Sequence, residues 1–201
     1  MTDATHAPAR SGNPESGKLR VARLLRAGAL LIAGFAIAFT APLHADAAFD
    51  RWMFAVTLLA IGVTTTLEFF ALRSTPASGL VAVRAAVALI AAAAVLASGS
   101  APDTSLVISA WAAASVVIAV VRVTRGSQAR AVAVPSALLS GLLAVLVLMF
   151  RDDLIAVIGF FGAYAIVRGV FLGISAFDTR EVAPSEGNAT EPGADAFAPA
   201  H

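Results

Sequence analysis

Apolar residues form six long windows along the chain, and the short segments between them hold most of the charged residues. A helix needs roughly 20 apolar residues to cross a bilayer core of about 30 Å. The windows are 24–41, 52–72, 80–97, 105–123, 131–150 and 154–177. Their apolar residues are continuous rather than alternating, which argues against membrane β-strands. The pattern therefore predicts an all-α fold, a polytopic membrane bundle of six transmembrane helices.

The segments between the windows are so short that neighbouring helices must run antiparallel, as three helical hairpins. We expect the membrane domain to span residues 23–180. Residues 1–22 and the acidic segment 181–201 are rich in small and polar residues and in proline, so they are predicted to be disordered tails. The window 80–97 is the least regular, because Arg84 interrupts its start.

The placement of charge predicts the orientation. Arginines and a lysine cluster before the first window, in the connection between the second and third windows, and in the connection between the fourth and fifth. Aspartates dominate the loops at the opposite ends of the windows. The positive-inside rule then places both termini in the cytoplasm and the protein in the cell membrane. A cleavable signal peptide is the alternative for the N-terminus, since Ala45-Asp46-Ala47 resembles a cleavage site. Cleavage would remove half of the first hairpin, so we favour a membrane span.

Glycines indicate where helices come close together. Shifting the first hairpin by 107 positions superposes Gly34 on Gly141 and Gly62 on Gly169, which favours an internal repeat over chance similarity. Small residues permit close contact between helices in lipid. We therefore predict helix packing at these four glycines and at Gly173. Gly169 and Gly173 also form a small-residue face that suits internal packing or self-association.

Part of the sequence carries a family resemblance. The segments GAYAIVRGVF at 162–171, AFDTR at 176–180 and ALLIAG at 29–34, the last followed by Pro42, resemble the HdeD-like acid-resistance membrane protein family. The second hairpin lacks the corresponding glycines. The resemblance implies six spans built from hairpin repeats and a stress-related membrane function. It supplies no catalytic residues.

Two ionisable residues lie inside predicted spans, where charge is costly and often functional. Glu68 is expected about 6 Å and Arg168 about 12 Å below the boundary of the membrane. They either snorkel separately, form an ion pair, or belong to a proton or ion pathway. Tyr164, four residues before Arg168, is a possible hydrogen-bond partner or a packing residue. Thr64 and Thr65 could line a polar path with Thr66, or bond to carbonyls of their own helix.

The opposite loops offer other candidates. Asp152 and Asp153 either sense acid or balance the inner arginines. His44 lies near two aspartates, Asp46 and Asp50, but has no further histidine nearby, so no metal site is predicted. Trp52 and Trp111 are predicted to be interfacial anchors.

The sequence excludes several function classes and leaves two. It contains no cysteine, which rules out disulfides and cysteine catalysis. Motifs for catalysis, for cofactors and for nucleic-acid binding are absent from it. We predict a non-enzymatic membrane protein of the stress-resistance kind, in contact with the lipid bilayer and with copies of itself or other membrane proteins. The alternative is a small transporter or channel subunit that moves protons or a small solute.

Overall fold

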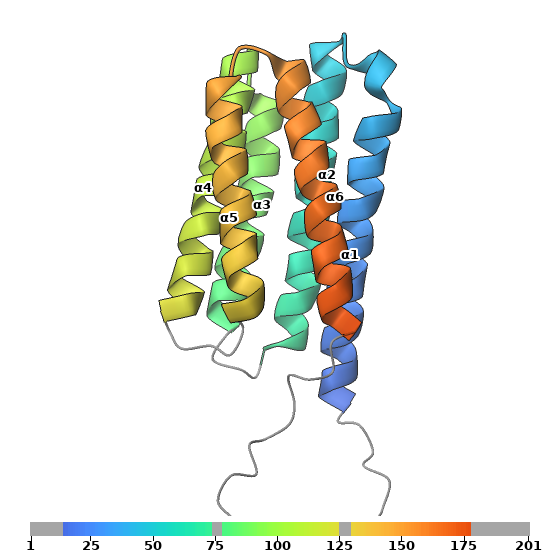
Figure 1. The fold of residues 1–201 in the computed structure, drawn as a ribbon, viewed down its shortest axis with the longest axis vertical. Coiled ribbons are helices and arrows are strands. Elements are labelled where there is room, and N and C mark those ends of the chain that lie inside the picture. Colours follow the sequence, from blue (N-terminus) through green and yellow to red (C-terminus); the bar gives the residue numbers. More distant parts are fainter. Residues whose placement is uncertain (1–13, 74–77, 125–129, 178–201) are drawn as a thin grey trace, which may run out of the picture.

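The computed structural model describes residues 14–73, 78–124 and 130–177. Its helices are α1 (Pro14–Phe39), α2 (Ala47–Ala71), α3 (Ser78–Ala97), α4 (Ala101–Thr124), α5 (Arg130–Met149) and α6 (Leu154–Phe177), and a short 3-10 helix, η1 (Ala41–Leu43), joins α1 to α2 (Figure 1). Each predicted window overlaps one helix, although the window 24–41 runs past the end of α1 into η1. The predicted all-α fold class is confirmed.

The helices of the described segments have the length and composition of membrane spans. Five of them are long and apolar enough to cross a membrane, and α5 contributes a shorter apolar stretch, Ala133–Met149. Many large apolar side chains point outward, among them Ile32, Phe70 and Ile174 at 73%, 60% and 67% exposure. An outward apolar surface of this extent is consistent with an integral membrane protein.

One predicted boundary is wrong. Residues 14–22 were expected to belong to a disordered tail, but α1 begins at Pro14. Residues 18–23 are Lys, Leu, Arg, Val, Ala and Arg, and most of these types favour a helix, so they continue the helix of the adjoining span outward. The rest of the two predicted tails lies outside the described residues.

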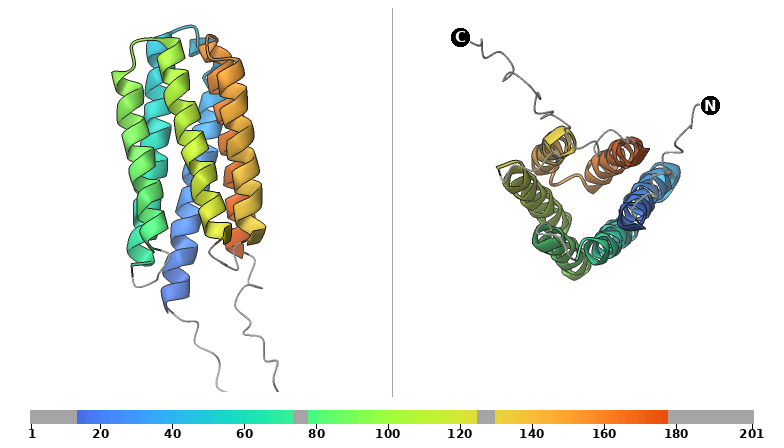
Figure 2. Two further views of the ribbon diagram at one scale, coloured as in Figure 1. Left: turned by 90° about the vertical axis from the view of Figure 1, so that its left-hand side faces the viewer. Right: turned by 90° about the horizontal axis from the view of Figure 1, so that it is seen from below.

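The six helices form a closed ring in chain order. Contacts join α1 to α2 and so on to α6, which returns to α1. Seen along its axis, the bundle shows this ring clearly (Figure 2). The most extensive contacts join α1 with α6, α2 with α3 and α4 with α5. The helices therefore pack more closely across the predicted hairpins than within them.

Because neighbouring helices run in opposite directions, the ring has two chemically distinct ends, one basic and one acidic. The basic end holds the starts of α1, α3 and α5, the ends of α2, α4 and α6, and the arginines of these segments. The acidic end holds η1, Asp103 in the first turn of α4, and the loops with Asp46, Asp152 and Asp153.

Three of the predicted packing glycines lie at crowded interfaces. A Cβ atom on Gly34 would lie 2.9 Å from the carbonyl oxygen of Gly162 in α6, and one on Gly169 would lie 3.1 Å from that of Ala27 in α1. A Cβ atom on Gly62 would lie 2.5 Å from the Leu89 side chain of α3. Glycine thus allows the backbones of α1 and α6 to approach closely.

The other two predicted packing glycines have more room. The nearest atom to a Cβ on Gly141 would be Val116 Cγ2 at 3.7 Å, and the nearest to one on Gly173 would be Ala27 Cβ at 4.0 Å. These are ordinary contact distances, so neither position requires glycine for space.

This difference predicts opposite outcomes for one substitution at two matched positions. Gly34→Ala is expected to destabilise the protein by about 2 kcal/mol, because a backbone oxygen must move. Gly141→Ala is expected to be neutral or to stabilise by up to about 1 kcal/mol, because alanine favours helix. Thermal unfolding in a neutral detergent measures both. Equal melting temperatures for the two variants would contradict the packing described.

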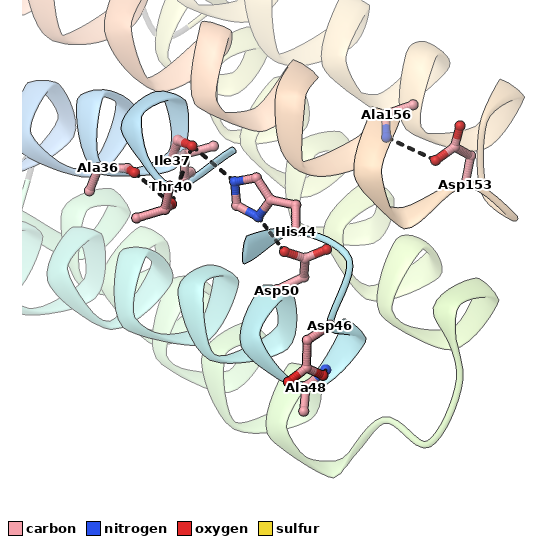
Figure 3. A network of polar contacts seen from close by, with 9 residues as sticks. All are labelled: Ala36, Ile37, Thr40, His44, Asp46, Ala48, Asp50, Asp153 and Ala156. Atoms are coloured by element: carbon pink, nitrogen blue, oxygen red, sulfur yellow. Dashed lines mark hydrogen bonds and ion pairs between the residues drawn. The ribbon is translucent and has the colours of Figure 1, made fainter. Parts of the chain in front are cut away.

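Acidic side chains at the acidic end cap the helices that start there. Asp46 accepts a hydrogen bond from the backbone N–H of Ala48 at 2.8 Å, and Asp153 accepts one from Ala156 at 3.0 Å (Figure 3). Each carboxylate satisfies an N–H group at the first turn of a helix. Helix capping therefore gives these two residues a structural role.

The core between the two ends is aromatic. The Phe161 ring packs against Phe54 and Trp111 with centroid distances of 5.2 and 5.8 Å, and Trp111 lies 5.9 Å from Tyr164. We call these four residues the aromatic cluster. The prediction that Trp111 is an interfacial anchor is wrong, because it is 5% exposed and faces this cluster, whereas Trp52 is 61% exposed. The sequence indicated how deep Trp111 lies in its span, but not the direction in which its side chain points.

Candidate functional site: an arginine-lined cavity

A cavity of about 70 Å³ lies inside the ring toward the basic end, and we call it the arginine cavity. All six helices contribute to its wall. The lining residues are Arg23 and Arg26 of α1, Glu68 of α2, Arg84 of α3, Ser115, Ile118, Ala119 and Arg122 of α4, Ala133 and Ser136 of α5, and Arg168, Leu172 and Ser175 of α6. One water molecule needs roughly 10–15 Å³, so the cavity has room for several.

The charges of the lining are strongly unbalanced. Among the described lining residues, five side chains are guanidinium groups and one is a carboxylate. Arg122 has a partner of its own, and the other four guanidinium groups exceed the carboxylate by three positive charges. Two of the arginines, Arg26 and Arg168, are only 3% and 5% exposed. Buried charges are costly unless an opposite charge lies beside them. A positive chamber of this kind attracts anions.

The carboxylate of the cavity already has a partner. Arg26 Nη1 donates a hydrogen bond to Glu68 Oε2 at 3.1 Å, in an ion pair between α1 and α2. The candidate pair from sequence, Glu68 with Arg168, is not among the ion pairs of the described residues. Sequence reasoning missed Arg26 because it lies at the very start of the window 24–41 and was counted as a topology residue.

Arg168 is held by hydroxyl groups instead. Its Nη1 atom donates hydrogen bonds to the Tyr164 hydroxyl and, at 3.1 Å, to Ser140 Oγ of α5. The two hydroxyl oxygens lie 3.2 Å apart. Tyr164 thus acts as the hydrogen-bond partner considered from sequence, and it also joins Arg168 to the aromatic cluster. Neither hydroxyl neutralises the charge of Arg168.

Several guanidinium donors of the cavity remain unused. The Nε atoms of Arg26 and Arg168 are buried and have no hydrogen-bond partner. Arg23 and Arg84 line the cavity and donate no hydrogen bond to another described side chain or carbonyl. Arg84 could have been found from sequence, because it interrupts an apolar window just as Glu68 and Arg168 do.

The threonine run of α2 does not reach the cavity. Thr64 and Thr65 donate hydrogen bonds to carbonyls of their own helix, Ala60 at 2.7 Å and Ile61 at 2.6 Å, and Thr66 does the same with Gly62. None of the three lines the arginine cavity. The sequence left two alternatives for Thr64 and Thr65, a polar path or bonds to their own helix. The bonds to the helix backbone form, and both residues lie outside the cavity wall.

A second polar site lies at the acidic end. The buried ring of His44 bridges α1 and α2, with Nδ1 2.5 Å from Asp50 Oδ1 and Nε2 2.9 Å from the Ile37 carbonyl oxygen (Figure 3). A carbonyl oxygen only accepts, so Nε2 carries a hydrogen, and a further proton lies between Nδ1 and Oδ1. Both ring nitrogens are therefore engaged within the protein, and the described residues place no third metal-binding side chain beside them.

This bridge predicts coupling between its two residues. His44→Leu and Asp50→Leu are each expected to destabilise the protein by about 2–3 kcal/mol, because each leaves a buried polar partner unsatisfied. The double variant is expected to lose clearly less than the sum of the two, since no orphaned partner remains. Thermal unfolding of the four proteins measures the coupling. Additive losses would show that the bridge does not stabilise the fold.

Comparison with models of protein families, with curated proteins and with solved structures finds no match for this chain. The resemblance to the HdeD-like family therefore stays a prediction that rests on the sequence segments alone.

Proposed function

We propose that the protein is a non-enzymatic membrane protein that binds an anion in the arginine cavity. The observation that carries this proposal is an excess of three positive charges, counted without Arg122, among the described lining residues of a cavity to which all six helices contribute. A binding pocket typically combines apolar walls with a few converging polar groups, and here these groups are nearly all guanidinium donors. An anion would offset the cost of burying them.

The side chains of the cavity suit binding better than catalysis. Guanidinium groups present several N–H donors in one plane, an arrangement that holds and orients anions. The carboxylate of Glu68, a possible general base, is engaged by Arg26. The three lining serines, Ser115, Ser136 and Ser175, have no histidine beside them in the cavity wall to activate them.

The natural reporter for this binding is Trp111. Its ring meets that of Tyr164 edge to face, and Tyr164 accepts a hydrogen bond from Arg168, so an anion that shifts Arg168 also alters the surroundings of Trp111. The exposed Trp52 can be replaced by phenylalanine to leave one tryptophan. We expect chloride, nitrate or phosphate, titrated separately, to give a saturable fluorescence change.

The controls for this titration use the cavity and its surroundings. Arg168→Gln and Arg84→Gln are expected to weaken the change at least tenfold, whereas Arg73→Gln, outside the cavity lining, should leave it intact. A linear response to every anion, or an unaltered response in both cavity variants, would refute anion binding in the cavity.

Transport is the second candidate function, and the position of the cavity favours it. A transporter binds its substrate where helices converge within the membrane. In this conformation the aromatic cluster fills the core above the cavity, with Phe54 and Phe161 fully buried. A route across the membrane would therefore require the cluster to separate. Anion flux into liposomes that contain the protein distinguishes a transporter from a binding protein.

We further propose that the basic end faces the cytoplasm in the cell membrane, as the positive-inside rule indicates. The native chain has no cysteine, so a thiol reagent labels only a cysteine that is introduced. An impermeant maleimide should label Asp152→Cys in intact cells, and it should label Arg73→Cys only after permeabilisation. Both positions are exposed in the structure. The reverse pattern would show that the cavity opens to the outside.

The physiological role we propose is resistance to acid stress, on the strength of the family resemblance alone. A deletion strain should survive acid challenge less well than its parent. The wild-type gene should restore survival, and Arg168→Ala should not, if the cavity is responsible. Unchanged survival of the deletion strain would remove this role without bearing on anion binding.

A further inference from the structure

The excess charge of the arginine cavity constrains the valence of its ligand. Arg26 and Arg168 are almost fully buried, and the single carboxylate lies against Arg26. Uncompensated charge within a membrane protein costs several kcal/mol for each ion. Counted without Arg122, the excess is three positive charges, and one bound monovalent anion would leave two of them. A ligand with two negative charges leaves one.

The donors of the cavity favour an oxyanion over a halide. Guanidinium groups present planar pairs of N–H donors, which match two oxygens of the same group. These donors come from different sides, with Arg26 on α1, Arg84 on α3 and Arg168 on α6. A tetrahedral oxyanion can offer a different pair of its four oxygens to each side, with some oxygens shared between pairs. A planar carboxylate has one pair only.

The acceptors of the cavity favour an oxyanion that carries a hydrogen. The Ser115 hydroxyl donates to the Trp111 carbonyl at 3.0 Å, and the Ser175 hydroxyl donates to Leu172 at 2.9 Å. Both hydroxyl oxygens then retain lone pairs as acceptors. Hydrogen phosphate can donate its hydrogen to such an oxygen, whereas sulfate has none to donate at neutral pH.

The volume of the cavity limits the ligand to a small group. About 70 Å³ holds a few atoms of the size of water, which suits a phosphate group but not a nucleotide. The phosphate of a larger molecule could also enter while the rest of that molecule stays outside.

We propose that the arginine cavity binds a phosphate group with about two negative charges. The source of this group is either inorganic phosphate or the phosphomonoester head of a membrane lipid. This inference rests on the proposed anion binding and names the chemical class of the anion. Arg84 is the residue that best tests it, because no described partner competes for its donors.

The test is thermal unfolding of the full-length protein in a neutral detergent, at matched low ionic strength. Inorganic phosphate at a few millimolar is expected to raise the melting temperature by about 5 °C relative to chloride. Arg84→Gln should lose this rise and, in anion-free buffer, melt no lower than wild type, because it lowers the excess positive charge of the cavity without breaking a hydrogen bond to a described residue. Arg73→Gln is the matched control and should keep the rise.

Two further arms identify the ligand. Dioctanoyl phosphatidate, compared with dioctanoyl phosphatidylcholine, tests the lipid source, and a rise with phosphatidate alone assigns the site to a lipid head. Sulfate tests the need for a hydrogen, and a rise as large as that with phosphate would overturn the assignment. Equal effects of phosphate, phosphatidate and chloride on the melting temperature would also overturn the assignment to a phosphate group. The proposal that the cavity binds anions would still stand. A phosphate rise that persists in Arg84→Gln would also overturn the assignment, because a general salt effect acts on both proteins.

Discussion

Exchanging the charges of Arg26 and Glu68 is expected to rescue a protein that either single reversal destabilises. The two side chains form the ion pair between α1 and α2, at 3% and 8% exposure. Arg26→Glu places two carboxylates together, and Glu68→Arg gives the cavity a sixth guanidinium group. Breaking a buried pair costs about 3–5 kcal/mol. Each single variant should therefore accumulate poorly in membranes, and the double variant should recover.

A second exchange serves as the control for this experiment. Glu68→Arg combined with Arg168→Glu conserves the same net charge but joins residues that the structure does not pair. This double variant should be no better than its worse single variant. Rescue by the second exchange instead of the first would show that Glu68 pairs with Arg168. Membrane abundance and thermal unfolding in detergent measure both exchanges.

Phe161→Ala is expected to have the next largest effect, because it opens a void in the aromatic cluster. The ring is fully buried and contacts Phe54 and Trp111 at centroid distances of 5.2 and 5.8 Å. Truncating a buried phenylalanine to alanine typically costs about 3–5 kcal/mol, through lost contacts and the remaining cavity. The melting temperature should therefore fall by about 10 °C.

The same substitution at an outward-facing phenylalanine is the control. Phe70 is 60% exposed on the surface of the bundle, so Phe70→Ala should change the melting temperature by no more than about 2 °C. Equal effects of the two substitutions would show that the aromatic cluster is not the packed core described. If the cluster also closes a path through the bundle, liposomes with Phe161→Ala should leak phosphate faster than those with Phe70→Ala.

The fold could be predicted from sequence because it depends on local composition. Continuous apolar windows specify membrane helices, and short connections specify antiparallel neighbours. Which helices approach most closely depends on side-chain direction around each helix. The five glycines illustrate the limit: Gly34 and Gly141 are matched in the proposed repeat, yet a Cβ atom would find a backbone oxygen at 2.9 Å in one case and only Val116 at 3.7 Å in the other.

The candidate site was only partly predictable for the same reason. Glu68 and Arg168 could be selected from sequence because charged residues are rare within a span. Both line the arginine cavity. Arg26, Arg84 and Arg122 looked like topology residues because they lie near the ends of apolar windows. Ring closure brings these ends together around one axis, and that proximity is a property of the tertiary arrangement. The internal repeat, like the family resemblance, stays a prediction.

Crystals grown with arsenate provide the most direct test of the central claim that the cavity binds an oxyanion. Hydrogen arsenate has the shape, the double charge and the hydrogen of the proposed ligand, and its arsenic is located by anomalous scattering. The account predicts an arsenic peak inside the ring, with oxygens within about 4 Å of the guanidinium groups of Arg84 and Arg168. Arsenic peaks confined to the outer surface, with the cavity holding none, would contradict it.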